Sequence, residues 1–351
     1  MYPDFHYLIR GIFGIDIPGL SILKTFGFFV ALGFIFGALA LQKELKRKAK
    51  AGLIQPDIRI NKKTGQSEKI YPHQRVSDII FVAAIAGFIG AKVFNALETW
   101  SDFIQDPIGS LFSRSGLTFY GGLILATVAL YYFARKIKLD FRHLCDAAAP
   151  ALILAYGIGR LGCHFAGDGD WGIYNSAYVS QADGTVKTAT IEEYNQVAAE
   201  KGQYMQHFEG KIPHIYYPAP SVLPRWFVAM NYKHNVNNEG MPIAGDQEEY
   251  NSVLPVAVFP TSVWEFLACA FIIFPILWSL RKKLNVPLQL FGLYLIFNGL
   301  ERFLVEKVRV NTRYDLGFIH PTQAEIISSL LILAGIILLV RKTKQSKAIP
   351  A

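Results

Sequence analysis

One segment of the chain, GRLGCHFAGDGDWG from Gly159 to Gly172, combines an arginine with a series of glycines. Arg160 ends the run AAAPALILAYGIG, which starts at Ala147 and contains no charged residue. An arginine in or near hydrocarbon costs several kcal/mol, so such a side chain usually faces a partner, a cavity or a substrate. The glycines, including Gly172, allow backbone to approach whatever the arginine holds. The segment therefore predicts an anion-binding site at membrane depth.

The same segment contains His164, Asp168 and Asp170. An imidazole and two carboxylates can ligate a metal, but one histidine without a second nearby is a weak metal signature. We expect no metal and no cofactor.

A second segment, SGLTFYGGL from Ser115 to Leu123, offers the hydroxyl of Tyr120 beside Gly121 and Gly122. The two glycines suit a substrate-binding surface. Small residues at this spacing also serve close helix packing, and the sequence leaves both interpretations open.

A third segment, ERFLVEKVR from Glu301 to Arg309, places Arg302 and Glu306 at i and i+4, on one helical face. The two can form a simple ion pair at the membrane interface. They can also act together with Arg160, since two guanidinium groups at the same predicted depth fit one phosphodiester. Arg309 follows one turn later.

Seven segments have the length and apolar character of membrane-spanning helices. With 52% hydrophobic residues in 351, the composition agrees with a polytopic membrane protein of the all-α class. We expect a single membrane domain, 1–351, built as a seven-helix bundle. The expected spans are Ile22–Leu41, Ile79–Leu97, Gly116–Phe133, Ala147–Phe165, Val258–Leu280, Leu288–Leu304 and Ala324–Val340.

The formal net charge of +8 has a topological explanation. Lysine and arginine gather in four clusters that fall on alternate sides of the seven segments, which is the positive-inside pattern. It predicts an outside N-terminus and a cytoplasmic C-terminus, and gives nucleic-acid binding little support. The clusters lie at 42–77, 135–142, 281–283 and 341–347.

The loop 166–257 is the largest predicted soluble part and carries eleven acidic residues against five basic ones. We expect it to form a small outward-facing cap, with a helical stretch near AEKGQYMQHFEGK (Ala199–Lys211). The three cysteines show no disulfide framework and no metal-ligand spacing. The first twenty residues lack a signal-peptide pattern and are typical of an aromatic interfacial segment.

The first segment resembles the signature of the prolipoprotein diacylglyceryl transferase family, Gly-Arg-x-Gly-Asn-Phe-x-Asn-Gly-Glu-x-x-Gly. Gly159, Arg160, Gly162 and Gly172 match its frame, with Cys163-His164 where the family commonly has one Asn. Asp168 or Asp170 stands near the acidic position of that signature.

Other motifs of the family follow in order along the chain. The family's His-Gly-Gly-Leu appears as Tyr120-Gly121-Gly122-Leu123, and its late Arg-x-x-x-Glu pair as Arg302 and Glu306. The His-Pro-Thr-Gln-Leu-Tyr-Glu motif is degenerate here and corresponds to Phe259–Glu265. Further matching segments are Asp146–Pro150 and Lys24–Gly27.

The resemblance implies an enzyme of the bacterial cytoplasmic (inner) membrane. It would move the diacylglyceryl group of phosphatidylglycerol to the lipobox cysteine of a prolipoprotein, forming a thioether and releasing glycerol phosphate. In this interpretation Arg160 and Arg302 bind the phosphate, Glu306 orients Arg302, and Tyr120 positions substrate while His164 or an acidic neighbour takes the thiol proton. The implied substrate-binding residues are Arg160, Arg302, Arg309, Gly121, Gly122, Gly172, Asp168 and Asp170.

Two other classes remain open at this point. A transporter or channel for an anionic solute would also place arginine on broken helices. Against it, the charged groups gather at one predicted membrane face and no internal repeat is present. The other class is a different phospholipid head-group enzyme that uses the same anion clamp.

Overall fold

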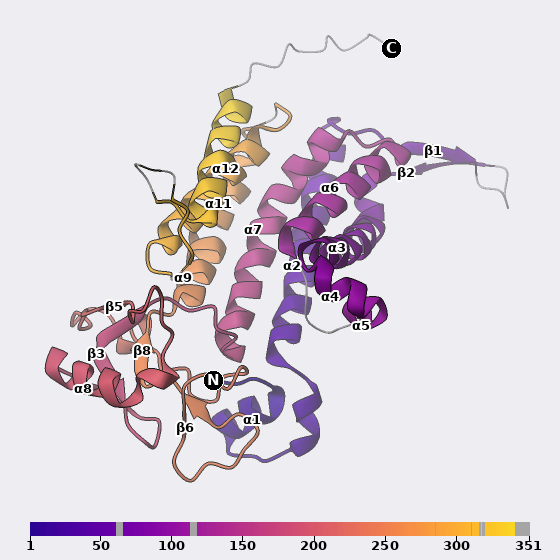
Figure 1. Cartoon of the computed structure of the whole chain (residues 1–351). Helices are drawn as coiled ribbons and strands as arrows, with labels where there is room; N and C mark the ends of the chain where they lie inside the picture. The colour runs from indigo at the N-terminus through magenta and orange to yellow at the C-terminus, as the bar shows by residue number, and fades with distance from the viewer. Residues whose placement is uncertain are drawn as a thin grey trace. The chain divides into compact units, whose positions relative to one another are not determined.

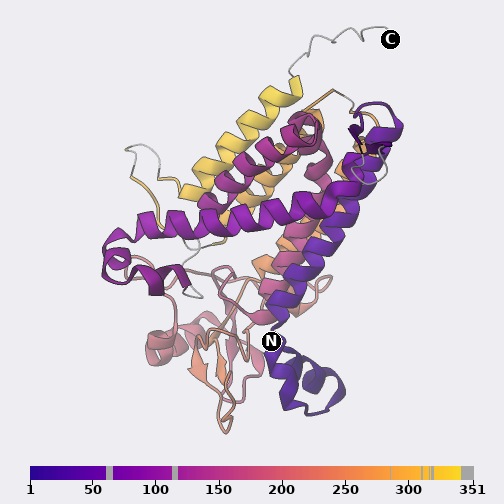
Figure 2. The same ribbon diagram turned by 90° about the vertical axis from the view of Figure 1, so that its right-hand side faces the viewer.

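The structure, a computed structural model, describes residues 1–60, 66–112, 118–284, 286–309, 311–315, 317 and 320–340. The chain is mostly helical and divides into two compact units. The first contains residues 1–36, 152–284 and the chain from 292 through the last helix; the second contains 37–151 and the described residues of 286–291. The ribbon is drawn in Figures 1 and 2 from two directions.

Five helical segments among the described residues are long and apolar enough to cross a membrane. They confirm an integral membrane protein in outline. They comprise α2 (Thr25–Lys50), α3 (Val76–Glu98) with the turn before it, α7 (Phe141–Ala166), the run α9–α10 (Thr261–Leu267, a π-helical turn Ala268–Ile273, and Phe274–Leu280), and α12 (Gln323–Val340).

The other two expected spans are also helical. They are α6 (Phe119–Lys136) and α11 (Gln289–Glu306). Gly116 and Ser115, at the expected start of α6, lie outside the described residues, as does the basic cluster at 341–347. Two expected boundaries were wrong: Ile22 belongs to a 3₁₀ turn, Pro18–Ile22, and Val258 ends a strand rather than starting a helix.

Glycines decide how closely the helices of each unit pack. In the second unit a Cβ on Gly121 would lie 2.3 Å from the Cβ of Phe94 and 2.6 Å from the carbonyl oxygen of Gly90, on α3. In the first unit a Cβ on Gly335 would lie 2.5 Å from the carbonyl oxygen of Gly292, so α11 and α12 run side by side (Figures 1 and 2). Larger residues would force these helices apart.

The loop 166–257 contains strands, which the all-α expectation did not include. Strand β3 (Tyr174–Ser180) is buried throughout and lies between β4 (Val186–Thr188) and β5 (His214–Ile215), and β8 (Val256–Val258) also pairs with it. Tyr174, Tyr178 and Val179 of β3 are residue types enriched in strands. A helical stretch was expected near Ala199–Lys211. The observed helix α8 spans Ile191–Lys201, so only the first three residues of the expected stretch belong to it.

The core of this folded loop is aromatic. Tyr174, Tyr194 and Tyr232 are almost fully buried and pack with Val179 and Val256. The remaining short strands β6 (Met241–Pro242) and β7 (Ser252–Val253) form a separate pair. We call residues 174–258 the cap. The cap belongs to the first unit, together with the helices that carry the site.

Short elements complete both units. The first unit starts with α1 (Phe5–Phe13), whose N-terminus is capped by Asp4 accepting from the backbone N–H of Tyr7 at 3.2 Å. The second unit includes the hairpin β1–β2 (Asp57–Ile60 and Ser67–Ile70) and the short helices α4 (Trp100–Gln105) and α5 (Pro107–Phe112).

Buried charges hold the second unit together. Asp146 and Lys48 are both about 1% exposed and pair at 3.8 Å. The Asp146 carboxylate also accepts from the backbone N–H groups of Leu288 and Phe291, each at 2.9 Å, at the start of α11. These are N–H groups that the helix itself leaves unsatisfied.

Candidate functional site

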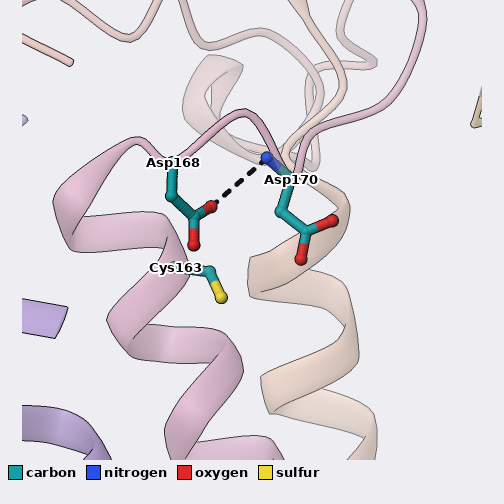
Figure 3. Close-up of side chains that lie close together, drawn as sticks. All are labelled: Cys163, Asp168 and Asp170. Carbon is teal, nitrogen blue, oxygen red and sulfur yellow. Dashed lines mark hydrogen bonds between the residues drawn. The ribbon is translucent and has the colours of Figure 1, made fainter. Parts of the chain in front are cut away.

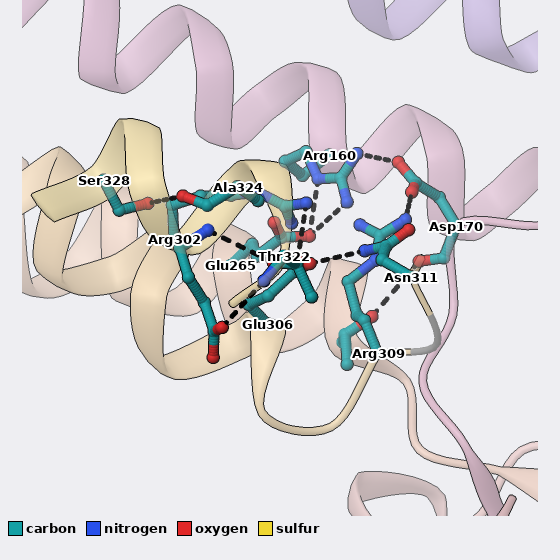
Figure 4. Close-up of polar contacts among 12 residues, drawn as sticks. Arg160, Asp170, Glu265, Arg302, Glu306, Arg309, Asn311, Thr322, Ala324 and Ser328 are labelled. Carbon is teal, nitrogen blue, oxygen red and sulfur yellow. Dashed lines mark hydrogen bonds and ion pairs between the residues drawn. The ribbon is translucent and has the colours of Figure 1, made fainter. Parts of the chain in front are cut away.

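Arg160 lies on α7, six residues before its end, and its guanidinium is clamped between two carboxylates (Figure 4). Nε donates to Oε2 of Glu265 at 2.6 Å, and Nη2 donates to the same oxygen. Nη1 donates to Asp170. The side chain is 11% exposed, so these are buried, charge-assisted hydrogen bonds of the stronger kind.

Glu265 is the residue of this site that sequence reasoning missed. It lies on the second turn of α9, fully buried, and its other oxygen accepts from the hydroxyl of Tyr156 at 2.9 Å. In the sequence, Glu265 stood out only as the last residue of the degenerate motif Phe259–Glu265. A usable signal existed, because a lone carboxylate in one apolar helix and a lone arginine in another are expected to pair.

Asp170 joins two of the arginines. One carboxylate oxygen accepts from Arg160 and the other from Arg309, which follows α11 (Figure 4). The backbone carbonyl of Asp170 also accepts from the hydroxyl of Thr261 at 3.2 Å. Two positively charged groups that would repel each other are therefore held by one carboxylate.

The backbone around Gly172 explains why these residues meet. The N–H of Gly172 donates to the carbonyl of Phe259, and the N–H of Ile173 donates to that of Val308, both at 2.8 Å. A Cβ on Gly172 would lie 2.7 Å from the carbonyl oxygen of Val308, so the three chain segments approach this closely only with glycine there. Asp170, the start of α9 and Arg309 are brought together as a result.

Arg302 and Glu306 form the i, i+4 ion pair on α11, with Nη2 and Oε2 2.8 Å apart. The Glu306 side chain is fully buried, and its Oε1 accepts from the side-chain amide of Asn311 at 2.7 Å. Arg302 is 28% exposed, more than Arg160. Glu306 therefore fixes the direction of a guanidinium that remains accessible.

Glu301, which directly precedes Arg302 on α11, is a second residue that the sequence did not single out. It is 7% exposed, and neither of its carboxylate oxygens has a hydrogen-bond partner among the described residues. It lies within electrostatic range of Glu265 and of Arg160. The described site thus holds more buried carboxylate than its arginines neutralise through direct contacts.

A cavity of about 850 Å³ opens beside the ion pairs. Glu306 and Arg309 line it from the α11 side. Phe208, Pro213 and His214 line it from the cap. Its walls therefore combine charged groups with apolar surface, as an amphiphilic ligand requires.

Asp168 lies beside Cys163, at the end of α7 (Figure 3). One ligand atom from each of Cys163, Asp168 and Asp170 lies within 4.8 Å of the others, which is close enough for a metal ion. Both oxygens of Asp170 are already engaged by arginines, however. Its carboxylate therefore serves first as an acceptor for guanidinium groups.

His164 faces a different partner from the carboxylates considered above. Its Nδ1 lies 3.2 Å from the hydroxyl of Tyr232, and burial raises the pKa of that phenol, which keeps its proton. His164 lines a separate cavity of about 480 Å³ with Met1 and His234. The structure thus gives His164 a tyrosine partner, where the sequence suggested Asp168 or Asp170.

Tyr120, Gly121 and Gly122 belong to the second unit. Tyr120 is 37% exposed on the first turn of α6, with its ring edge-on to Phe119. Gly121 and Gly122 both face α3: a Cβ on Gly122 would lie 2.9 Å from the carbonyl oxygen of Gly87. The packing interpretation of these two glycines is therefore correct, whatever else they do.

The three arginines can do one kind of chemistry together. Each is oriented by a carboxylate, and guanidinium groups bind phosphate through two parallel hydrogen bonds. Fixed donors of this kind stabilise negative charge that develops on a leaving group.

Comparison with known proteins agrees with this chemistry. The family model described as "prolipoprotein diacylglyceryl transferase" matches residues 13–341. Relatives named phosphatidylglycerol–prolipoprotein diacylglyceryl transferase include that of Chlorobaculum tepidum, 28% identical over 286 residues, which are 78% of this chain and 75% of the relative. That of Staphylococcus haemolyticus is 24% identical over 326 residues, 93% and 86% of the two chains.

A third relative of the same name, from Leptospira interrogans, is 28% identical over 194 residues, or 48% of this chain. The matched region spans about half of that relative, 53% of its length. The family model, in contrast, covers nearly the whole chain and includes both segments that carry the arginines, 159–172 and 301–309. The chain belongs to the prolipoprotein diacylglyceryl transferase family.

Proposed function

We propose that this protein transfers the diacylglyceryl group of phosphatidylglycerol to the lipobox cysteine thiol of a prolipoprotein. The observation that carries the proposal is a network of three arginines, each oriented by a carboxylate: Asp170 joins Arg160 to Arg309, and Glu306 holds Arg302. Arg309 and Glu306 of this network line the cavity. Family membership supports the same reaction and gives no support to a transporter or to another head-group enzyme.

The reaction is a displacement at the CH₂ carbon of the diacylglyceryl group that is bonded to the phosphate oxygen. The cysteine sulfur forms a bond to this carbon, and the carbon–oxygen bond to phosphate breaks. The thiol gives up its proton, and glycerol phosphate leaves with the electrons of the broken bond. The site must therefore stabilise charge on the phosphate and accept one proton.

The arginines answer the first need. Arg160 and Arg302 bind the phosphate and stabilise the leaving group, and Arg309 holds the head group at the cavity. Glu265 and Glu306 fix the two guanidinium groups. Arg160 and Arg309 already bind one anionic group, the Asp170 carboxylate, which agrees with an anion-binding site at this position. Asp168 and Gly172 shape the turn that carries it.

The proton acceptor belongs to the same proposal. His164 or an acidic neighbour takes the thiol proton, and the hydrogen bond of His164 to Tyr232 orients the imidazole ring. Tyr120 positions the substrate on the helix that Gly121 and Gly122 hold against α3.

The membrane arrangement completes the proposal. The five candidate spans are joined by α6 and α11 into a seven-helix bundle in the bacterial cytoplasmic membrane, with the N-terminus outside and the C-terminus in the cytoplasm. The cap, inserted between the fourth and fifth spans, then lies on the outer face with the active site. The signal-peptide and lipobox region of the prolipoprotein reaches it there.

A transfer assay in liposomes tests the function. Labelled phosphatidylglycerol and a lipobox peptide are supplied, and label on the peptide is measured by mobility. Arg160→Ala is expected to lower the rate by about two to three orders of magnitude. Arg142→Ala is the matched control, since Arg142 lies on the same helix, 54% exposed, and should leave transfer unchanged. Solute flux without transfer would refute the proposal.

A further inference from the structure

Charged residues are unevenly distributed along the loop 166–257, most of which forms the cap. The loop 166–257 carries eleven acidic residues, yet none lies between Lys211 and Asn238. That stretch does contain three basic residues, Lys211, Arg225 and Lys233. One part of an otherwise acidic loop therefore has no group that an anionic surface would repel.

Large apolar and aromatic side chains are exposed within this stretch. Val222 is 85% exposed and Trp226 is 49% exposed. Ile215, Tyr216 and Tyr217 are each more than two-fifths exposed. We call these five residues the aromatic face. Clusters of exposed apolar side chains on a folded surface usually mark a binding site for protein or membrane.

The backbone under the aromatic face is fixed, so the exposure is a property of the fold. The N–H of Tyr217 donates to the side chain of Asn175 at 3.1 Å, and the Asn175 amide donates back to the carbonyl of Tyr217 at 2.8 Å. The N–H of Ala219 donates to the hydroxyl of Tyr178 at 2.7 Å. Three prolines, at 218, 220 and 224, restrict the stretch further.

The aromatic face lies at the end of a candidate membrane span. The indole N–H of Trp264, on the first turn of α9, donates to the carbonyl of Phe227 at 2.8 Å. The rings of Tyr217 and Phe259 are 6.4 Å apart, and α9 starts two residues later, at Thr261. The end of a spanning helix lies at the level of the lipid head groups, where tryptophan and tyrosine are enriched.

We propose that the aromatic face is seated in the head-group region of the lipid leaflet at the N-terminal end of α9. Its tyrosine and tryptophan rings suit the boundary between acyl chains and head groups, and its freedom from acidic residues suits anionic phospholipid. The inference goes beyond the enzymatic function and does not depend on it. It makes the cap a second membrane contact of the protein, next to the cavity that Pro213 and His214 line.

A fluorescent probe at position 222 tests this placement in the full-length protein. Val222→Cys is labelled with an environment-sensitive fluorophore and the protein is reconstituted into vesicles of phosphatidylcholine and phosphatidylglycerol. The high exposure of Val222 means that the substitution disturbs no packing. The unsubstituted chain, labelled in the same way, corrects for reaction at the three native cysteines. Iodide in the buffer and a nitroxide attached to lipid are the two quenchers.

The control probe is placed on a polar surface of the same cap, at Asn195→Cys, an exposed position of α8. At position 222 we expect emission at shorter wavelength, strong quenching by the lipid nitroxide and protection from iodide. At position 195 we expect the reverse. The proposal is overturned if iodide quenches both probes equally. It is also overturned if neither quencher reaches position 222, because protein would then cover the face.

Discussion

The substitution Glu265→Gln probes the clamp around Arg160 most directly. The fully buried carboxylate accepts from Nε of Arg160 at 2.6 Å, from Nη2, and from the Tyr156 hydroxyl at 2.9 Å. Glutamine has one acceptor oxygen and an NH₂ group, so at least one charge-assisted hydrogen bond is lost. Such a bond is worth about 1.5–3 kcal/mol.

Loss of that free energy from the phosphate-binding geometry corresponds to about a 10- to 150-fold fall in the transfer rate. The assay is diacylglyceryl transfer in liposomes, with thermal unfolding followed in parallel. Because removing one partner of a buried pair also destabilises the fold, Arg160→Lys is measured as well. Lysine keeps the positive charge but loses the planar guanidinium. We therefore expect a clear fall in the transfer rate with only a small change in the unfolding temperature.

The matched control is Lys187→Gln, which breaks an exposed ion pair with Glu193 in the cap, 3.0 Å long. Exposed pairs contribute little, so neither transfer nor unfolding should change. Wild-type transfer and an unchanged unfolding temperature in Glu265→Gln would refute the reasoning, since the clamp would then do nothing for Arg160.

Three further predictions concern the surroundings of the site. Gly172→Ala should destabilise the protein by about 1–3 kcal/mol and lower transfer, because its Cβ would lie 2.7 Å from the Val308 carbonyl oxygen. Gly159→Ala is the control, since a Cβ there meets nothing within 4 Å. Equal unfolding temperatures for the two variants would contradict the prediction. Asp170→Asn should lower kcat/KM by about tenfold or more, because two guanidinium groups lose their shared carboxylate, and an unchanged value would remove Asp170 from that role. The cap should unfold more easily at about pH 5 than at neutral pH, because burial lowers the pKa of His234 in the folded state. The unfolded chain then binds the proton more readily, so stability is present above the unfolded value of about 6.5 and falls as pH decreases through it. His234→Asn should reduce the difference in unfolding temperature between the two pH values, and an unchanged difference would exclude this histidine as its source.

The cap shows where local sequence patterns stopped being informative. The sequence predicted a folded cap with one helical stretch, and the buried strand β3 was not predicted. YNSAYVS has no clear alternation because all seven residues are buried, with β4, β5 and β8 around them. Burial on both faces removes the period-two signal on which strand prediction rests.

Local features of the sequence predict the membrane class and the positions of the arginines. Long apolar runs and the cost of placing a guanidinium among them are local properties, so the helices and Arg160 could be predicted from composition and spacing. Arg302 and Glu306 could be paired for the same reason, since i and i+4 share a face whatever the fold.

The pairing of those charges across helices depends on the fold. Glu265 and Arg160 are 105 residues apart, and Asp170 and Arg309 are 139 apart. No periodicity connects such positions. They meet because a glycine at 172 lets three chain segments approach within hydrogen-bond distance, and because a buried charge must find an opposite one.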